Sequence, residues 1–292
     1  MEVIIGKTAG FCYGVRRAVE GAKEELENSN EKIECLGEIV HNKQVIQSLE
    51  SKGLVFIDDI KKAKGKVIIR AHGVEKKIYE IGKEKGIKLK DYTCPNVLKI
   101  HKIVEEYSKK GYYIFLCGSP NHPENIGTIS YCGNRYSVIE KEEDVSEALE
   151  KLEKSKINKL LLISQTTYSM EKFCDIEKCI KDEIAKEIEL IVKNTICHAT
   201  EVRQKETQKL SKEVDFMIIV GGKNSSNTKK LYNISKENCN KSICVETKHD
   251  IDIEEIRKYN KIGIMAGAST PQEVIQEIVE EIENDSKIMI NA

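Results

Sequence analysis

The chain has 292 residues, which is long enough to bury sizeable cores in two or three domains. Its 47 Lys and Arg residues nearly balance its 48 Asp and Glu residues, which argues against nucleic acid or an anionic membrane as a partner. We find no secretory leader and no apolar run of about 20 residues, so we expect a cytoplasmic protein whose 10 cysteines stay reduced.

Short β-branched runs alternate with amphipathic helical runs along the chain, which is typical of parallel sheets covered by helices. One pattern recurs three times: a cysteine opens a helical run, and two further apolar runs each end in polar residues. The cysteines that open the repeats are Cys12, Cys94 and Cys197. We therefore predict three α/β domains, over residues 1–93, 94–193 and 194–292.

The second apolar run of each repeat ends in polar residues at nearly the same distance from its cysteine. His41 lies 29 residues after Cys12, and His122 and Ser225 each lie 28 residues after their cysteines. The third runs end at His72, at Thr166 and Thr167, and at Ser269. Ligands of parallel α/β sheets bind beyond the carboxyl ends of the strands, so these residues are expected to face one cavity.

Three cysteines in register indicate a metal site, because the N–H groups at the start of a helix favour the thiolate. Three thiolates leave a fourth coordination position open. A single such cysteine would more simply be a small buried side chain, and no short C-x₂-C spacing indicates a cluster. The other cysteines, which lie outside the register or inside apolar runs, are interpreted as structural or free thiols: Cys35, Cys117, Cys132, Cys174, Cys179, Cys239 and Cys244.

The segment GGKNSSNTKKL places Ser225, Ser226 and Asn227 at a helix start after glycines. Hydroxyl, amide and backbone N–H groups there can surround a phosphate, although ordinary helix capping is the alternative. The segment AGASTP repeats the arrangement at Ser269 and Thr270. Two such helix starts favour an anion site.

Histidines and one glutamate complete the set of polar residues at the predicted strand ends. Imidazolium groups at His41 and His72 would add charge-assisted hydrogen bonds to a phosphorylated ligand. The HPE sequence places His122 beside Glu124, the one carboxylate among these positions. A buried Glu124 could hold a proton at neutral pH and deliver it to a leaving group.

The last helix has the clearest boundaries in the sequence. Thr270 can cap it, Pro271 suits its first position and Glu273 would complete a capping box. Its predicted buried stripe consists of Val274, Ile275, Ile278, Val279 and Ile282.

Over almost its full length the chain resembles the 4-hydroxy-3-methylbut-2-enyl diphosphate reductase family. The motifs that carry the resemblance occur in that family's order: FCYGVRRAV, GEIVHN, RAHGV, TCPNVLKIH, HPENIGT, SQTT, NTICHAT, VGGKNSSNT and AGASTP. The resemblance implies reductive removal of the substrate's hydroxyl to give isopentenyl and dimethylallyl diphosphate. Electrons would come from ferredoxin or flavodoxin.

The resemblance also implies a fold and a cofactor. It implies a trefoil of three small, mostly parallel α/β domains around a [4Fe–4S] cluster bound by Cys12, Cys94 and Cys197. The fourth iron would take the substrate's hydroxyl.

The family's substrate-binding residues match positions of this chain. Thr166 and Thr167 would lie by the hydroxyl end, and Glu124 with His122 would serve catalysis, with Glu124 in proton delivery. The residues implied to hold the diphosphate are His41, His72, His122, Ser225, Ser226, Asn227 and Ser269.

Three positions depart from the family's usual pattern without removing a matched ligand. They are Asn194 in NTIC, Asn96 after the proline of TCPN, and Asn125 after the glutamate of HPEN. These departures concern the contacts around the site.

Three other readings remain open from the residues. Quinolinate synthase also resembles a threefold α/β assembly around a three-cysteine cluster, but it would not need the SSN and AGAST hydroxyls together with HPE. A non-enzymatic iron–sulfur sensor would bind a cluster and ignore prenyl diphosphates. A structural zinc protein with three cysteines and a histidine would bind zinc without sulfide.

Overall fold

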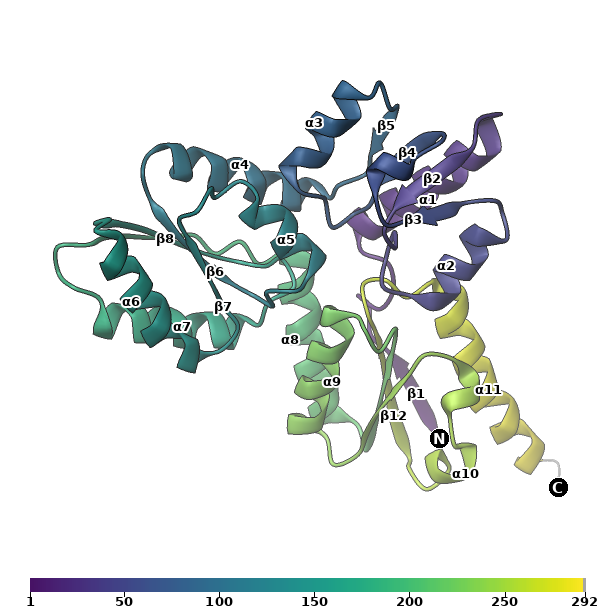
Figure 1. The fold of residues 1–292 in the computed structure, drawn as a ribbon. Helices are drawn as coiled ribbons and strands as arrows, with labels where there is room; N and C mark the ends of the chain where they lie inside the picture. Colours follow the sequence, from purple (N-terminus) through teal and green to yellow (C-terminus); the bar gives the residue numbers. More distant parts are fainter. Residues whose placement is uncertain (291–292) are drawn as a thin grey trace. The chain divides into compact units, whose positions relative to one another are not determined.

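The computed structural model of the chain describes residues 1–290, and side chains as far as residue 284. Helices and strands alternate throughout (Figure 1). The strands form three four-stranded sheets in which every pair is parallel. The predicted α/β class with small parallel sheets is therefore confirmed.

The first sheet has the strand order β3-β2-β4-β5. Its strands are β2 (Ile33–Leu36), β3 (Val55–Ile57), β4 (Lys66–Ile69) and β5 (Leu89–Asp91). The helices of this part of the chain are α1 (Tyr13–Asn28), α2 (Lys43–Glu50) and α3 (Lys76–Glu84), with a 3₁₀ turn at Ile60–Lys62.

The second sheet has the order β7-β6-β8-β9. Its strands are β6 (Tyr113–Cys117), β7 (Tyr136–Ile139), β8 (Lys159–Ser164) and β9 (Glu189–Val192). Its helices are α4 (Pro95–Lys109), α5 (Pro123–Ile129), α6 (Val145–Ser155) and α7 (Met170–Glu183), with a 3₁₀ turn at Glu142–Asp144.

The third sheet has the order β1-β12-β10-β11 and takes in the first strand of the chain. Its strands are β1 (Glu2–Ile5), β10 (Phe216–Val220), β11 (Ser242–Val245) and β12 (Lys261–Ala266). Its helices are α8 (His198–Glu213), α9 (Ser226–Asn238), α10 (Ile253–Ile256) and α11 (Gln272–Ile290), with a 3₁₀ turn at Lys248–Asp250.

The three sheets share one topology, in which β1 takes the place that β5 and β9 hold in the other two. Glu2–Ile5 pairs in register with residues 261–264, so the first strand lies in the sheet formed by the last part of the chain. Each of these edge strands is followed by one of the cysteines Cys12, Cys94 and Cys197. The cysteines therefore lie on the segments that lead from one sheet to the next.

The chain divides into two compact units. The central unit comprises residues 17–39 and 49–197, and the terminal unit comprises residues 1–16, 40–48 and those from 198 onward. The central unit holds the first and second sheets, and the terminal unit holds the third. The ranges 1–93, 94–193 and 194–292 remain a prediction as domain boundaries.

Two inner strands, β6 and β10, are apolar because both of their faces are covered. All five residues of β6 and of β10 are buried, as is typical of strands in parallel sheets with helices on both sides. The buried stripe of α11 packs in the same cluster as Phe216, Ile218 and Val220 of β10, as predicted. None of the described helices combines the length and the apolar character needed to cross a bilayer.

The start of α11 differs from the prediction. The helix begins at Gln272, and the Thr270 hydroxyl donates to the carbonyl of Val220 at 2.9 Å. The hydroxyl thus ties the loop after β12 to the end of β10.

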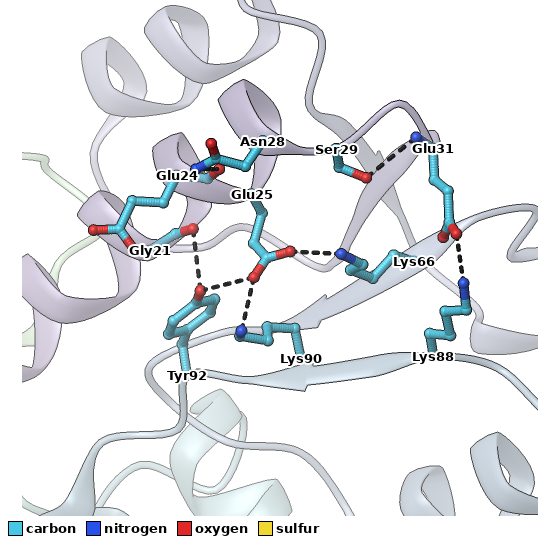
Figure 2. A network of polar contacts seen from close by, with 10 residues as sticks. All are labelled: Gly21, Glu24, Glu25, Asn28, Ser29, Glu31, Lys66, Lys88, Lys90 and Tyr92. Carbon is cyan, nitrogen blue, oxygen red and sulfur yellow. Dashed lines mark hydrogen bonds and ion pairs between the residues drawn. The ribbon is translucent and has the colours of Figure 1, made fainter.

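A polar network holds α1 on the first sheet (Figure 2). The carboxylate of Glu25 pairs with the ammonium groups of Lys66 at 2.7 Å and Lys90 at 2.8 Å, and these contacts keep the pKa of Glu25 below its usual value. The Tyr92 hydroxyl donates to the carbonyl of Gly21 at 3.1 Å. Residues 17–28 of α1 are thereby fixed against β4 and β5.

Candidate functional site

Each of the three predicted metal-binding cysteines directly precedes a helix, as the sequence predicts. Cys12 precedes α1, Cys94 is the N-cap residue of α4 and Cys197 precedes α8. All three are half-buried, and none of them forms a disulfide bond.

The same backbone hydrogen bond fixes each of these cysteines. Its N–H donates to a carbonyl two residues beyond the end of β12, β4 or β8. The pairs are Cys12 with Ala268 at 3.2 Å, Cys94 with Ala71 at 2.9 Å and Cys197 with Thr166 at 2.9 Å. The repeat seen in the sequence is therefore a repeat of local geometry as well.

Three of the cysteines outside the predicted metal site have a different environment. Cys35, Cys117 and Cys132 are completely buried. Burial raises the pKa of the Cys35 and Cys132 thiols to about 12 and raises that of Cys117 as well. A metal ligand must be a thiolate, so these three suit a structural role.

Two of the candidate ligands belong to neighbouring parts of the central unit. Asn96 lies two residues after Cys94, and its Nδ2 donates to Sγ of Cys197 at 3.0 Å. Cys197 and the start of α4 are therefore neighbours. Thiol sulfurs are soft ligands, and this donor set fits an iron–sulfur cluster or zinc.

Helix α8 fixes the loop that leads to Cys12 in the terminal unit. The buried guanidinium of Arg203 donates to the Thr8 carbonyl at 2.6 and 2.8 Å and to the Gly10 carbonyl at 2.8 Å. Glu206 accepts the N–H groups of Lys7 at 2.7 Å and Thr8 at 2.9 Å. Sequence reasoning missed this pair, whose signal is an Arg and a Glu three residues apart on one helix face.

The Glu124 carboxyl is buried in the central unit, with 2% of the residue exposed. One of its oxygens accepts the N–H of Thr166 and the other accepts the Thr166 hydroxyl, both at 2.6 Å. The Thr166 carbonyl in turn accepts the N–H of Cys197. One residue thus joins a buried acid to a candidate metal ligand.

Burial raises the pKa of Glu124 to about 7, even though the hydrogen bonds from Thr166 lower it. Removal from water disfavours the carboxylate, and two short hydrogen bonds offset that cost only in part. Near neutral pH the group therefore exists in both protonation states, as a proton donor requires.

His122 and His72 lie close together in the central unit. Their half-buried rings meet edge to face with centroids 5.4 Å apart. His122 caps α5, and its Nδ1 accepts the N–H of Glu124 at 3.2 Å. In the neutral ring the proton then sits on Nε2, which makes Nε2 a donor to a ligand.

Thr167 belongs to a hydrogen-bonded group that the sequence did not reveal. Its hydroxyl accepts from Nε2 of Gln165 at 2.8 Å, and Oε1 of Gln165 accepts from Nδ2 of Asn125 at 3.0 Å. Asn125 is completely buried and also donates to the Ser119 carbonyl at 2.7 Å. The departure from the family pattern at Asn125 therefore supplies a buried contact behind Thr167.

The start of α9 forms the polar part of the terminal unit. Ser225 caps the helix, with its hydroxyl accepting the N–H of Thr228 at 3.3 Å. Asn227 is 3% exposed, yet among the described residues neither its Nδ2 nor its Oδ1 has a hydrogen-bond partner. Such an amide can form hydrogen bonds with a polar ligand, because its NH₂ group and its oxygen both remain available.

His41 and Ser269 lie against this helix start. The Ser269 hydroxyl donates to the His41 carbonyl at 3.3 Å. Gly222 approaches the same carbonyl so closely that an added Cβ would lie 2.5 Å from the oxygen. The predicted site residues are therefore divided between the two units. The terminal unit contains His41, Ser225, Ser226, Asn227 and Ser269. The central unit contains His72, His122, Glu124, Thr166 and Thr167.

Comparison with known proteins gives a consistent result. Residues 3–283 match the family model described as LytB protein. The 4-hydroxy-3-methylbut-2-enyl diphosphate reductase of Caldanaerobacter subterraneus subsp. tengcongensis is 43% identical, with 97% of both chains covered. The enzyme of that name from Clostridioides difficile is 40% identical over 97% of this chain and 100% of its own.

Solved structures agree with the sequence relatives. A structure of (E)-4-hydroxy-3-methyl-but-2-enyl diphosphate reductase, the terminal enzyme of the non-mevalonate pathway, is 40% identical, with a TM-score of 0.71 and 97% and 100% of the two chains covered. The E-1-hydroxy-2-methyl-but-2-enyl-4-diphosphate reductase of Plasmodium falciparum is 34% identical, with a TM-score of 0.86 and 96% and 87% covered. The resemblance seen in the motifs is confirmed, and the chain belongs to the LytB protein family.

Proposed function

We propose that the protein is a 4-hydroxy-3-methylbut-2-enyl diphosphate reductase. It would remove the allylic hydroxyl of that substrate as water, with the uptake of two electrons and two protons, and give isopentenyl and dimethylallyl diphosphate. Membership of the LytB family supports the reaction. The observation that carries the mechanism is the buried Glu124 carboxyl, which Thr166 joins to Cys197.

Cys12, Cys94 and Cys197 would hold a [4Fe–4S] cluster. When bound, such a cluster supplies electrons and a Lewis-acidic iron for the substrate's hydroxyl. The support is their common position before a helix and their common backbone hydrogen bond. The buried, high-pKa thiols Cys35 and Cys132 would take no part.

The diphosphate would bind at the start of α9 and beside the histidines. The partnerless amide of Asn227 and the hydroxyls of Ser225, Ser226 and Ser269 can donate to phosphate oxygens, and the start of α9 adds backbone N–H groups. His41, His72 and His122 would add imidazole donors, as the family resemblance implies. Because the diphosphate does not react, its binding energy can fix the position of the hydroxyl end.

Glu124 would act as the proton donor. Its carboxyl can release a proton through the Thr166 hydroxyl to the departing oxygen, and that hydroxyl can turn to accept from the protonated acid. Thr167 would lie beside Thr166 at the hydroxyl end of the substrate and orient that end.

The electron donor would be ferredoxin or flavodoxin, and the protein would work in the cytoplasm.

An anaerobic assay tests the proposal directly. The protein is reconstituted with iron and sulfide, reduced with a viologen dye and mixed with 4-hydroxy-3-methylbut-2-enyl diphosphate, and dye oxidation and products are followed. We expect substrate-dependent oxidation with release of both isoprenoid diphosphates. A stable cluster that ignores the substrate would instead indicate an iron–sulfur sensor, and zinc without sulfide would indicate a structural zinc protein.

A further inference from the structure

The side-chain amide of Asn96 contacts the sulfur of one candidate ligand. Asn96 is the second residue of α4, and its Nδ2 lies 3.0 Å from Sγ of Cys197. A thiolate has no proton to donate, so the amide must present its NH₂ group to the sulfur. The contact is therefore a hydrogen bond to the electron-rich atom of the ligand.

This donor breaks the threefold repeat. Two residues after each cysteine, the chain has Gly14, Asn96 and Ala199 in the three repeats. Neither glycine nor alanine has a side-chain donor, so the three cysteines are not equivalent. Cys197 receives a hydrogen bond that the corresponding residues of the other two repeats cannot provide.

We propose that Asn96 is a positioning residue that raises the reduction potential of the cluster through Cys197. The inference rests on the proposed function, because it takes Cys197 as a cluster ligand. A hydrogen bond to a ligating sulfur stabilises the more negative, reduced state, which makes reduction easier. The bond also restrains the orientation of the Cys197 side chain relative to α4.

The test compares midpoint potentials of the reconstituted protein by EPR-monitored redox titration. Asn96→Leu removes the donor, and Asn96→Asp keeps the shape but turns a donor into a negatively charged acceptor. Asn194→Asp is the matched control for charge. Asn194 lies three residues before Cys197, its Oδ1 accepts the N–H of Ile196 at 3.0 Å and its Nδ2 faces Sδ of Met170.

We expect a more negative midpoint potential in Asn96→Leu and a larger negative shift in Asn96→Asp than in Asn194→Asp. Equal shifts in the two aspartate variants, or an unchanged potential in Asn96→Leu, would overturn the inference and leave the cluster assignment intact. A wild-type protein that retains no iron and sulfide would overturn the proposed function and, with it, the inference.

A second measurement uses the unsubstituted protein, in case Asn96→Leu loses its cluster. Resonance Raman spectra in H₂O and D₂O report hydrogen bonds to ligating sulfurs through the iron–thiolate stretching bands. We expect a deuterium shift that Asn194→Asp retains and Asn96→Asp loses. An identical shift in both variants would contradict a role for Asn96.

Discussion

Thr166 holds the Glu124 carboxyl at both of its oxygens, one through the backbone N–H and one through the hydroxyl, each at 2.6 Å. Its carbonyl accepts the N–H of Cys197 at 2.9 Å. Two hydrogen bonds therefore connect the Glu124 carboxyl, through Thr166, to the candidate cluster ligand Cys197. Three of the predictions below concern this acid and its partner.

The first prediction is that turnover falls as the pH rises through about 7. The pKa of Glu124 is raised to about 7, so the protonated donor is present below that pH and is lost above it. Glu124→Gln should slow turnover by about 10²- to 10⁴-fold and abolish this step in the pH profile. Steady-state rates from pH 5.5 to 9 measure both effects. A step that persists in Glu124→Gln would assign it to another group.

The second prediction concerns stability. The folded-state pKa of Glu124 lies above its ordinary value of 4.5, so between pH 4.5 and 7 the folded state binds more protons than the unfolded state. The stabilisation from this group is therefore complete below pH 4.5 and is lost as the pH rises to about 7. Urea denaturation of the cluster-free protein should show this decline, and it should be weaker in Glu124→Gln. A parallel decline in both proteins would contradict the assignment.

The third prediction separates the two hydrogen bonds of Thr166. Thr166→Val removes the hydroxyl and keeps the N–H, so the carboxylate loses one of the contacts that lower its pKa. The step in the pH–rate profile should move to higher pH, and turnover should fall because the proton route is interrupted. Thr166→Ser is the control, since it restores a hydroxyl at the same position. An unmoved pH step in Thr166→Val would show that the hydroxyl does not govern the acid.

The fourth prediction identifies the metal ligands. Replacing Cys12, Cys94 or Cys197 with serine should reduce the iron and sulfide retained after reconstitution. Cys174→Ser on the exposed face of α7 and Cys117→Ser in the core should retain both. Metal and sulfide analysis of desalted protein provides the measurement. Equal losses in all five variants would rule out the three-cysteine site.

The fifth prediction concerns Asn227. Its buried amide lacks partners among the described residues, so Asn227→Ala should cost the substrate-free protein little stability. It should weaken diphosphate binding by about 10- to 100-fold, the equivalent of about 1–3 kcal/mol for a hydrogen bond to a charged group. The exposed neighbour Asn224 provides the control, as Asn224→Ala. Calorimetric titration with pyrophosphate compares the two, and equal affinity would move the anion site elsewhere.

Local features of the fold follow directly from the sequence. Short apolar runs determine where the strands before His72 and Thr166 end. Nearby helix-forming residues determine where the helices after Cys94 and Cys197 begin. Such signals are contained within about ten residues, which is why they can be recognised without a structure. The start of α11 shows the limit, because a tertiary hydrogen bond to Val220 engages the hydroxyl of Thr270.

Long-range partners could not be inferred in the same way. Arg203 donates to the carbonyl of Thr8, which lies 195 positions earlier in the chain. Glu2 and Lys261, which pair in the third sheet, are even further apart in the chain. Nothing in either segment alone specifies the other, because these contacts depend on the packing of whole sheets and helices. The same holds for Asn96, which the sequence marks as unusual but not as a partner of Cys197.

The pairing of β1 with β12 sets an order of events during synthesis. Translation proceeds from the N-terminus, so residues 2–5 leave the ribosome long before residues 261–264 exist to pair with them. The hydrogen bond from the N–H of Cys12 likewise cannot form until Ala268 has been synthesised. The first candidate ligand to be made is thus the last to be fixed in place, and a nascent chain interrupted before β12 lacks the backbone partners that hold it.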